Sequence, residues 1–595
     1  MNLIESKYQL ILFGDSNPHF YNLKGMLSER MSNLGMDMDK LVSYPPIPEF
    51  RTRNMPTLGI YFKTKENIES EKGKDEKIIK TLQDEGTPVV TVVKVSKKNN
   101  EEQSSLLPPD DYFTLTSFSS ENYLKLADYV LDLFGLLDKK RVLVNYAEET
   151  PNQVVKALSK ELALRNYDVD NELYQINGNK EFEETCQDRL ANSEILVFFH
   201  TFHSLKDPWV QARLAYAARL QVGILEVMES DNVLSYGLLN KQVRLDKMER
   251  PNCGRASIAA RLADMVERWR IANRAMQTGN LTGSLCKYIK KLSTVDWKLH
   301  PGHWVSSYQY DKTYYYVPAI GATHPECFDV LWTRAKRLVP QNGEKGKMYL
   351  LYDGLCMKTH DEAYRKQLDG YSPVELMDVR KFFPAPRPQK TKNVFLLVSL
   401  PSPWKDADQS YFQTINLLAV RNAICAFFAM LPPDVMVHLA AHPSVLFLIG
   451  SILKWKGQKS EDCVKIYKHD YLIGKYPNYN EMFKDCTVLA DGQNETNDEA
   501  GAWGAVYDKM LAADSYDAGV VIGGAAGNIA VAFRFIDKYK DAVLVPVSST
   551  GGVAKELYDR HRNMIRCPTG IKDELENEAI EYQYLFRAFF EALRE

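Results

Sequence analysis

Two glycine-rich turns near the carboxyl end of the chain carry the residues best suited to bind a phosphate. Each turn follows an apolar run of strand length, 519–522 or 543–547, and precedes a segment with helical spacing of apolar residues. Glycine at such a turn lets backbone N–H groups approach a phosphate closely, and the positive end of the following helix favours negative charge. The residues predicted to offer N–H groups or a hydroxyl are Gly523, Gly524, Gly527, Thr550, Gly551 and Gly552.

The elements needed to position these turns repeat along most of the chain. Strand-length apolar runs alternate with helical segments, from 8–13 through 141–146 to 393–398. The alternation predicts the α/β fold class, with several flavodoxin- or Rossmann-like parallel-sheet domains in tandem. Two glycine turns in succession would then line one cleft at the carboxyl edge of a sheet, although either turn alone is typical of simple strand packing. After the strand-length run 393–398, the apolar spacing predicts one long helix over 411–430.

The length and composition are those of a globular protein with several domains. The chain has 595 residues, of which 45% are hydrophobic and 25% charged. A stiff proline-rich linker at 384–388 marks the last boundary. We predict α/β domains over 1–137, 138–275, 276–390 and 391–595, with 231–300 mainly helical and a β-α-β set whose helix spans 324–338.

The charge and cysteine content exclude several classes of partner and location. Lys and Arg total 74 against 77 Asp and Glu, so no basic excess predicts nucleic-acid binding. The nine cysteines lack C-x-x-C spacing, which favours reduced thiols and a cytoplasmic protein. The most apolar stretch, 415–431, is interrupted by Arg421 and Asn422, so we expect no membrane span.

Two histidine pairs, His200 with His203 and His300 with His303, raise the alternative of a zinc site. Neither pair has a cysteine or carboxylate cluster nearby with the spacing of metal ligands. We therefore expect loop or partner contacts at these histidines. No metal and no tightly bound cofactor are predicted.

The segment 138–275 resembles a TIR (Toll/interleukin-1 receptor) domain of the bacterial kind. The resemblance lies in the order of its elements, in a first strand that ends at Asn145 and Tyr146, and in Trp209 followed four residues later by Arg213. Enzymatic TIR domains carry a glutamate at that last position, which assists cleavage of the nicotinamide–ribose bond of NAD as positive charge develops on the ribose. Arg213 reverses the charge there, which implies a degenerate, catalytically impaired TIR-like domain.

Two hypotheses for this domain stay open. In the first, it is an assembly or binding module, and the implied catalytic positions Asn145, Trp209 and Arg213 have lost their chemistry. In the second, it is an active TIR NAD+ glycohydrolase switched on by nucleotide binding, with Glu226 or Glu229 supplying the carboxylate. The resemblance implies self-association in either case, and thus a homo-oligomer.

The block from about 392 to 595 resembles the STALD domain, the sirtuin- and TIR-associated branch of the SLOG nucleotide-binding superfamily. Besides the two glycine turns, the matching pieces are a strand that ends in Ser-x-Pro and a His-Pro-Ser turn. The chain departs from the family at Ala440-Ala441, where two glycines are usual, and at Ala526, where an acidic residue is usual. The implied ligand contacts outside the glycine turns are Ser399, Pro401, Lys405, His442, Pro443 and Ser444.

The STALD resemblance implies a cleft for an NAD-derived nucleotide, such as a cyclic ADP-ribose isomer, as in Thoeris-type anti-phage systems. His442 and Ser444 would bond a ribose or phosphate, and Lys405 would supply a counter-charge. We thus expect a cytoplasmic immune signalling protein that binds a small nucleotide, with a possible protein partner for its output and no nucleic-acid or membrane partner. A nucleotide-processing SLOG enzyme is a third hypothesis; it needs a carboxylate beside the glycine turns, and Ala526 argues against it.

Overall fold

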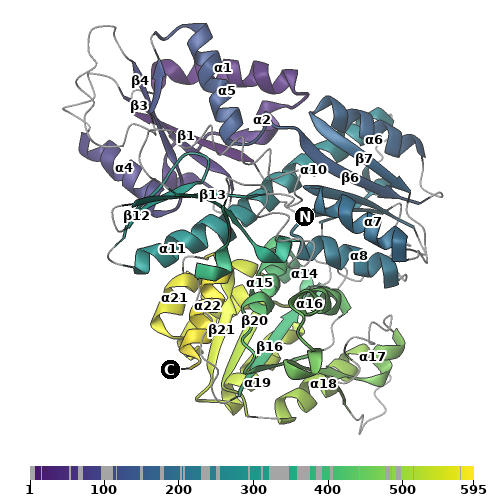
Figure 1. Ribbon diagram of the computed structural model, residues 1–595. Coiled ribbons are helices and arrows are strands. Elements are labelled where there is room, and N and C mark those ends of the chain that lie inside the picture. The colour runs from purple at the N-terminus through teal and green to yellow at the C-terminus, as the bar shows by residue number, and fades with distance from the viewer. Residues whose placement is uncertain are drawn as a thin grey trace.

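Four β-sheets, each flanked by helices, make up the computed structural model of the protein (Figure 1). The structure describes residues 7–14, 16–52, 55–63, 72–94, 112–115, 117–147, 152–173, 180–201, 204, 208–228, 241–248, 255–292, 295–309, 312–320, 347–357, 375–382, 391–401, 406–440, 443–475, 483, 486–490, 498–513, 515–576 and 578–594.

The first sheet is parallel throughout and has the strand order β2-β1-β3-β4-β5. This is the flavodoxin-like order, in which the chain starts inside the sheet and then builds outward on both sides. Buried residues such as Leu10, Ile60 and Val90 fill its core against α1 and α5. The elements are β1 Tyr8–Gly14, α1 Asn17–Asn33, α2 Met38–Leu41, β2 Val42–Ser43, β3 Thr57–Lys63, α4 Lys72–Asp84, β4 Val89–Lys94, β5 Tyr112–Leu115 and α5 Ser120–Leu133.

The second sheet has the order β10-β9-β8-β6-β7 and is also parallel, again a flavodoxin-like arrangement. Strand β8, for example, is buried along its whole length, because helices cover both faces of the sheet. The elements are β6 Lys140–Tyr146, α6 Asn152–Leu164, β7 Tyr167–Leu173, α7 Lys180–Ala191, β8 Ile195–His200, α8 Pro208–Arg219, β9 Gly223–Met228, β10 Lys241–Arg244, α9 Leu245–Met248 and α10 Arg255–Thr278.

The third sheet departs from the predicted parallel pattern. Strands β11, β12 and β13 pair antiparallel, and only β13, β14 and β15 pair parallel. The described part of 231–300 is mainly helical, as predicted, and β10 and β11 add edge strands to two sheets. The expected helix 324–338 and the linker 384–388 lie outside the described residues. The elements are a π-helical turn Gly279–Gly283, α11 Ser284–Lys291, β11 Asp296–Leu299, β12 Val305–Gln309, β13 Lys312–Pro318, β14 Lys347–Tyr352 and β15 Glu375–Asp378.

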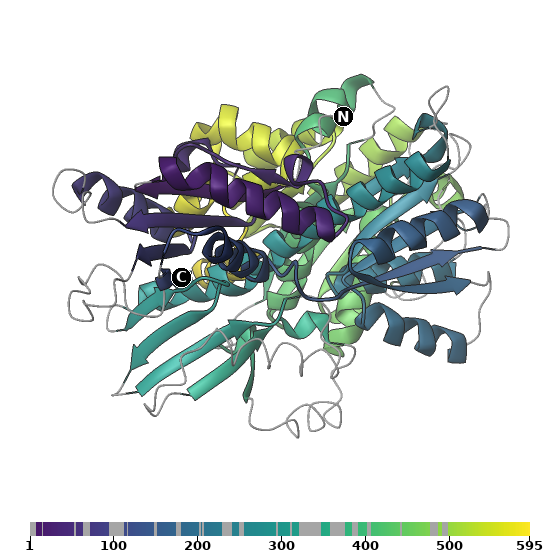
Figure 2. The same cartoon turned by 90° about the horizontal axis from the view of Figure 1, so that it is seen from above.

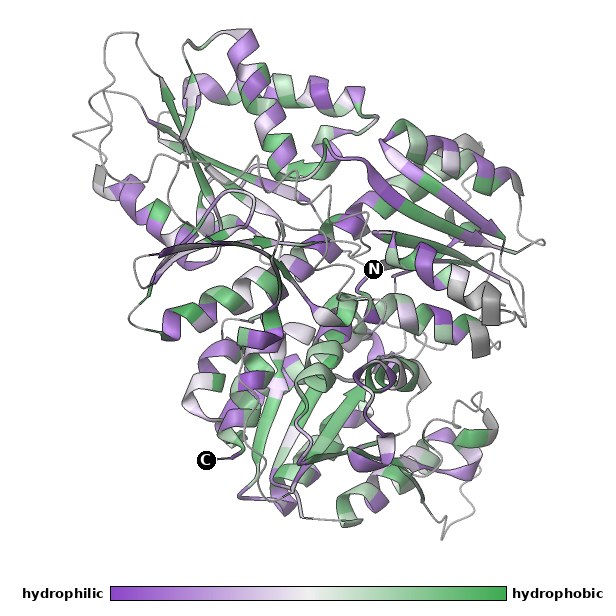
Figure 3. Cartoon of the chain, in the orientation of Figure 1, coloured by the Kyte–Doolittle hydropathy of each residue, from purple (hydrophilic) through white to green (hydrophobic). Residues whose placement is uncertain are grey.

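The fourth sheet is parallel and has the order β19-β18-β17-β16-β20-β21. Its central strands are strongly apolar, as Figure 3 shows for β16 and β20. The strands are β16 Lys392–Ser399, β17 Val435–Ala440, β18 Val464–Lys468, β19 Thr487–Leu489, β20 Ala518–Gly523 and β21 Val543–Val547. The helices are α14 Gln409–Thr414, α15 Leu417–Met430, α16 Pro443–Lys456, α17 Asp470–Lys475, α18 Glu499–Ala513, α19 Gly527–Lys538, α20 Gly552–His561, α21 Thr569–Glu576 and α22 Tyr582–Ala592.

The α/β fold class predicted from the sequence is confirmed by these sheets. The prediction of one helix over 411–430 is wrong, since α14 and α15 meet at an angle of 76°. The break lies at Ile415 and Asn416, where Asn416 Oδ1 caps α15 by accepting Ala419 N–H at 3.1 Å. Among the described residues no single helix has the length and apolar character to cross a membrane; the bent pair α14–α15 meets that test by length and composition only.

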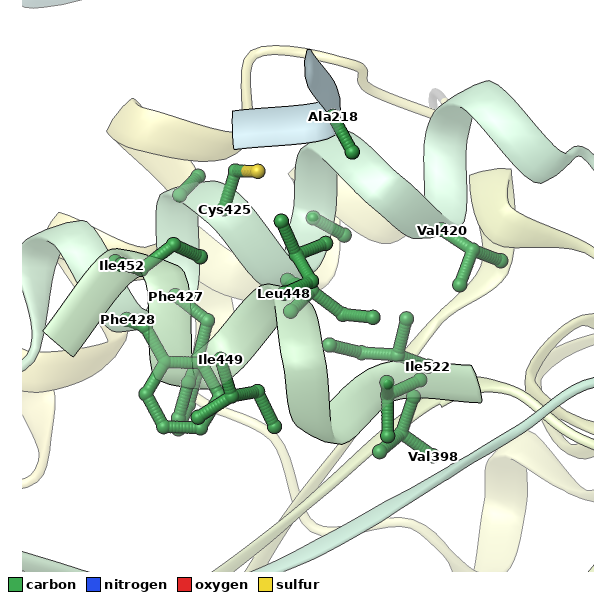
Figure 4. Packing of buried hydrophobic residues seen from close by; sticks show 14 of the residues in the cluster. Ala218, Val398, Val420, Cys425, Phe427, Phe428, Leu448, Ile449, Ile452 and Ile522 are labelled. Atoms are coloured by element: carbon green, nitrogen blue, oxygen red, sulfur yellow. The ribbon is translucent and has the colours of Figure 1, made fainter. Parts of the chain in front are cut away.

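The second and fourth sheets share one hydrophobic core. Helices α15 and α16 of the fourth sheet pack against α8 of the second, where Ala218, Cys425 and Leu448 lie close together (Figure 4). Figures 1 and 2 both show the fourth-sheet domain (green to yellow) in contact with the rest of the chain. Burial of this extent makes the two parts one structural unit.

A buried ionic cluster joins the first and second sheets through α10. Glu267 and Arg270 of α10 pair at 2.8 Å, Lys140 of β6 lies 3.5 Å from Glu267, and Tyr8 and Tyr167 donate hydroxyl groups to the same carboxylate. Burial raises the pKa of the Glu267 carboxyl, but the neighbouring Arg270 and Lys140 cations outweigh burial and lower it overall. The cluster thus fixes β1 to β6 through charge-assisted bonds that no solvent reaches.

Candidate functional site

The glycine turns lie at the point where the strand order of the fourth sheet reverses. After β16 the chain adds β17, β18 and β19 on one side, and then returns to add β20 and β21 on the other. Ser399, the last residue of β16, pairs in register with Gly523, the last residue of β20. In open parallel sheets, ligands bind outside the carboxyl ends of the strands at such a switch point.

The paired glycines adopt backbone conformations that other residues avoid. Gly523, Gly524, Gly551 and Gly552 have φ angles of 64°, 110°, 75° and 60°. A Cβ atom added to Gly552 would lie 2.6 Å from the Gly524 carbonyl oxygen, so the two turns touch through their backbones. Val553 N–H also donates to that oxygen at 3.2 Å. The glycines are therefore required for the two turns to meet.

Most N–H groups of the first turn are bonded to protein acceptors. Gly523 N–H donates to Thr550 Oγ1 at 2.8 Å, and Gly524 N–H donates to the Ser399 carbonyl at 2.9 Å. Ala525 N–H donates to both Ser399 Oγ and Asn528 Oδ1, at 3.0 and 2.9 Å. Ser399 and Thr550 are buried, so their oxygens hold the turn from the protein side. These N–H groups face the protein interior, rather than an open cleft.

A segment after β16, residues 406–416, covers both turns, and we call it the strap. Asp408 Oδ1 accepts Ala526 N–H at 2.8 Å, at the start of α19, and Thr414 Oγ1 accepts Gly552 N–H at 3.2 Å, at the start of α20. A Cβ atom on Gly551 would lie 2.1 Å from the Thr414 carbonyl oxygen. Asp408 of the strap thus places a carboxylate beside the glycine turns, where the side chain of Ala526 provides none.

The remaining predicted ligand contacts are distributed around the same sheet edge. Pro401 is buried just after β16, and Pro443 and Ser444 open α16, which follows the neighbouring strand β17. Gly527, at the start of α19, is exposed, and a Cβ atom added to it would meet no atom within 4 Å. Gly527 therefore marks the open side of the turn. The predicted contacts Lys405 and His442 lie outside the described residues.

Two of the predicted TIR positions converge on a carboxylate that the sequence analysis did not single out. Asn145 Nδ2 donates to Glu172 Oε2 at 2.5 Å, and Arg189 lies 3.6 Å from Oε1 of the same side chain. Burial raises the pKa of the Glu172 carboxyl, while Arg213 and Arg189 act against burial. Arg213 itself is 1% exposed, so the charge-reversed position lies inside the domain. Trp209 belongs to α8, with its side chain outside the described residues.

Glu226, the alternative carboxylate, lies deeper still. It is fully buried on β9, and His200 Nε2 lies 3.1 Å from Glu226 Oε2. The other ring nitrogen of His200, Nδ1, lies 3.0 Å from Ser204 Oγ, which also bonds the backbone of Thr201. This arrangement ties the end of β8 to β9 and turns the carboxylate away from solvent. Glu229 and His203 lie outside the described residues.

The second histidine pair serves packing and turn formation. His300 stacks on Trp304 with ring centroids 3.6 Å apart, and its Nε2 lies 2.7 Å from Ser306 Oγ. His303 has a φ of 62° in the turn before β12. Within the described ranges, no group of three or more His, Cys, Asp or Glu side chains could hold a metal ion.

A cavity of about 1120 Å³ lies away from the glycine turns, between the first and third sheets, α11 and the final helices. Its charged lining is largely paired: Lys287 lies within 3.1 Å of Glu581, and Arg51 lies 2.7 Å from Glu85. Both acidic and basic side chains line the walls, so the lining does not clearly favour anions or cations. We therefore place the candidate site at the sheet edge, where the backbone geometry is specific, and not at this cavity.

Comparison with known families bears on this sheet edge. Residues 410–589 match the SLOG cluster3 family. The matched segment includes both glycine turns, α14, α15 and β17 to β21, and it supports nucleotide-related ligand binding by the carboxyl-terminal part of the chain. No match was found among curated proteins.

Sequence reasoning found the glycines and Ser399 but missed Asp408 and Thr414. The partners of these two side chains lie 118 and 138 residues away in the chain. The local signal near Asp408 is that of a helix start, with Asp406 and Asp408 ahead of α14. Such a signal predicts where a helix begins but not which other helix its residues will cap.

Proposed function

We propose that the carboxyl-terminal domain is a sensor for an NAD-derived nucleotide of the cyclic ADP-ribose type, and that the bound nucleotide controls self-assembly of the TIR-like domain in a cytoplasmic anti-phage immune protein. The observation that carries the proposal is the position of both glycine turns at the switch point of a parallel sheet, within the segment that matches the SLOG family. The STALD branch of that superfamily is part of the proposal.

The chemistry of the site suits a diphosphate. Helices α19 and α20 each begin at one of the two glycine turns, and the turns touch at Gly524 and Gly552, which brings two positive helix ends near each other. A diphosphate carries negative charge at two neighbouring positions, one for each helix end. Lys405, which follows β16 in the chain, and His442 and Ser444, which follow β17, are proposed to contact the ribose and balance the phosphate charge.

The TIR-like domain is proposed to act by assembly and not by hydrolysis. A ribose that develops positive charge needs an accessible carboxylate. Glu172 is 5% exposed and bonded to Asn145, while Glu226 is fully buried beside His200. Neither carboxylate faces solvent, which argues against hydrolysis at these two side chains. The output proposed in its place is a homo-oligomeric scaffold that passes its signal to a protein partner. Active NAD+ hydrolysis is the competing proposal.

Gly527 offers a direct test of the nucleotide site. Its Cβ position is open, and it begins α19, so Gly527→Asp would add a negative charge at the proposed phosphate position without a clash. Calorimetry with ADP-ribose and its cyclic isomers should show binding by the natural protein and a loss of affinity of about tenfold or more in Gly527→Asp, because like charges at one helix end repel.

Gly527→Ala is the matched control, since it fills the same space without charge, and it should bind within about twofold of the natural protein. Incubation with NAD+ in the same experiment measures nicotinamide release, and light scattering measures assembly. Ligand-dependent assembly without release supports the scaffold; nicotinamide release would establish the enzyme in its place. Equal affinity in both Gly527 variants, or no binding of any ADP-ribose compound, would contradict the sensor.

A further inference from the structure

The strap occupies the positions at which an anion would meet the two glycine turns. Asp408 places a carboxylate on Ala526 N–H at the positive end of α19, and it is 6% exposed. Thr414 places a hydroxyl on Gly552 N–H at the positive end of α20. Helix α19 has twelve residues and helix α20 has ten, and the N-termini of both are therefore capped by this one segment.

The strap is attached more weakly than the helix that follows it. None of the residues Gln409–Thr414 of α14 is buried, whereas eleven of the fourteen residues of α15 are. Tyr411 packs partly into the core on the side of α20, and Asn416 N–H donates to the Thr550 carbonyl at 3.0 Å. A segment held by a few polar contacts opens locally at much lower free energy than a buried helix.

A hinge for such opening lies between the two helices. The axes of α14 and α15 differ by 76°, and Ile415 and Asn416 form the break. Because Asn416 caps α15 with its own side chain, α15 keeps its first turn whether or not α14 stays in place. Movement of the strap therefore need not disturb α15, although it removes the partly buried Tyr411 from its packing.

We infer that the strap is a built-in competitor for the nucleotide: the Asp408 carboxylate holds the place of a phosphate, and the strap swings away when a phosphate takes that place. The inference rests on the proposed function, since it concerns the same site. A phosphate and the Asp408 carboxylate cannot share Ala526 N–H, because two negative groups at hydrogen-bond distance from one donor repel each other. Binding is thus an exchange of one anion for another, and the strap lowers the apparent affinity.

The test is Asp408→Asn, which keeps the shape of the side chain and an oxygen for Ala526 N–H but removes the charge. Calorimetry with ADP-ribose should show affinity that is higher by about 5- to 30-fold, the upper part of the range for a charge at a helix end, because Asp408 is buried. Adenosine, which has no phosphate, should bind all variants alike. Asp406→Asn is the matched control: it removes the same charge from an exposed position of the strap, and it should leave ADP-ribose affinity unchanged.

Hydrogen exchange measures the opening of the strap independently of ligand binding. The amides of Ala526 and Gly552 should exchange well before those of α15, and faster in Asp408→Asn than in Asp406→Asn. The proposed role of the strap would be contradicted by either of two results: unchanged ADP-ribose affinity in Asp408→Asn, or exchange of these amides only together with those of α15. If no variant binds any nucleotide, the proposed function fails, and early exchange alone then decides whether the strap opens. Cleavage of the nucleotide by the natural protein but not by Asp408→Asn would make Asp408 a catalytic acid and overturn its role as competitor.

Discussion

Gly551 is the position in the site that is least able to accept a side chain. Its φ of 75° and the approach of the Thr414 carbonyl, 2.1 Å from a built Cβ position, leave no room for a side chain. Gly551→Ala should therefore lower the free energy of unfolding by about 2 to 4 kcal/mol, through backbone strain and displacement of the strap. Urea denaturation of the purified protein measures this loss.

The control for that substitution is Gly527→Ala, at a glycine with open space and no positive φ. It should change the free energy of unfolding by less than about 1 kcal/mol. A loss of the same size in both variants would mean that Gly551 is not specifically constrained by the strap.

At this scale the sequence predicted what is local and missed what is distant. Paired glycines after an apolar run identify a turn with positive φ, because few other residues adopt that conformation. Asp408 and Thr414 carry no comparable signal, since an aspartate and a threonine near a helix are ordinary caps. Only the fold decides that they cap α19 and α20.

Lys456 at the end of α16 controls how α15 ends. Its ammonium donates to the Phe428 and Leu431 carbonyls at 2.9 and 3.0 Å, which would otherwise be unpaired at the carboxyl end of α15. Burial lowers the pKa of Lys456 to about 8 from 10.5. Lys456→Met should thus cost about 2 kcal/mol of unfolding free energy at pH 7.

The pH dependence of that cost has a definite sign. Between pH of about 8 and 10.5 the unfolded chain keeps the Lys456 proton, whereas the folded chain has lost it. The natural protein therefore gains stability as pH rises through this window, and Lys456→Met does not, so the difference between them should grow by about 3 kcal/mol. Lys454→Met, at an exposed position of α16, is the control. Parallel pH profiles for Lys456→Met and the natural protein would contradict this account.

Helices and strands are predicted correctly where the apolar periodicity of the sequence agrees with burial in the fold. The prediction fails at α14 and α15. The apolar residues continue with helical spacing across the break, so periodicity alone joined the two helices. The break is set by Asn416, which bonds both Ala419 and Thr550, and the second of these contacts is tertiary. Similarly, the polar–apolar alternation of β11 spans only four residues, Asp296–Leu299, which is too short to identify a strand by itself, and the pairing with β12 decides.

Buried polar contacts join the domains in addition to the hydrophobic core that the second and fourth sheets share. Arg421 of α15 is fully buried and donates to the Val222 carbonyl at 2.8 Å and to Asn273 Oδ1 at 2.5 Å. Burial lowers the pKa of Arg421 to about 10. In the sequence, Arg421 and Asn422 indicate only that the apolar stretch 415–431 does not span a membrane. Their structural role could not be inferred, because it depends on partners in other domains.

Asn273→Ala should remove one acceptor from the buried Arg421 guanidinium and the bond from Asn273 to the Gln221 carbonyl. We expect a loss of about 3 kcal/mol, and calorimetric unfolding that separates the fourth-sheet domain from the remainder. Asn22→Ala, at an exposed position on α1, should change stability by less than about 0.5 kcal/mol. A single unshifted transition in Asn273→Ala would show that the domains are joined by apolar packing alone.

The position of α15 between two domains has a consequence for how this protein can be inherited and recombined. A nucleotide-binding domain that touched its neighbour only through a linker could be exchanged freely between genes. Here Asn280 of the π-helical turn bonds Asn422 at 3.1 Å and also accepts Tyr582 N–H at 3.1 Å, so three segments from different parts of the chain must match at one point. A change in one of these segments is therefore expected to need matching changes in the other two, so the domains should be exchanged together and not one at a time.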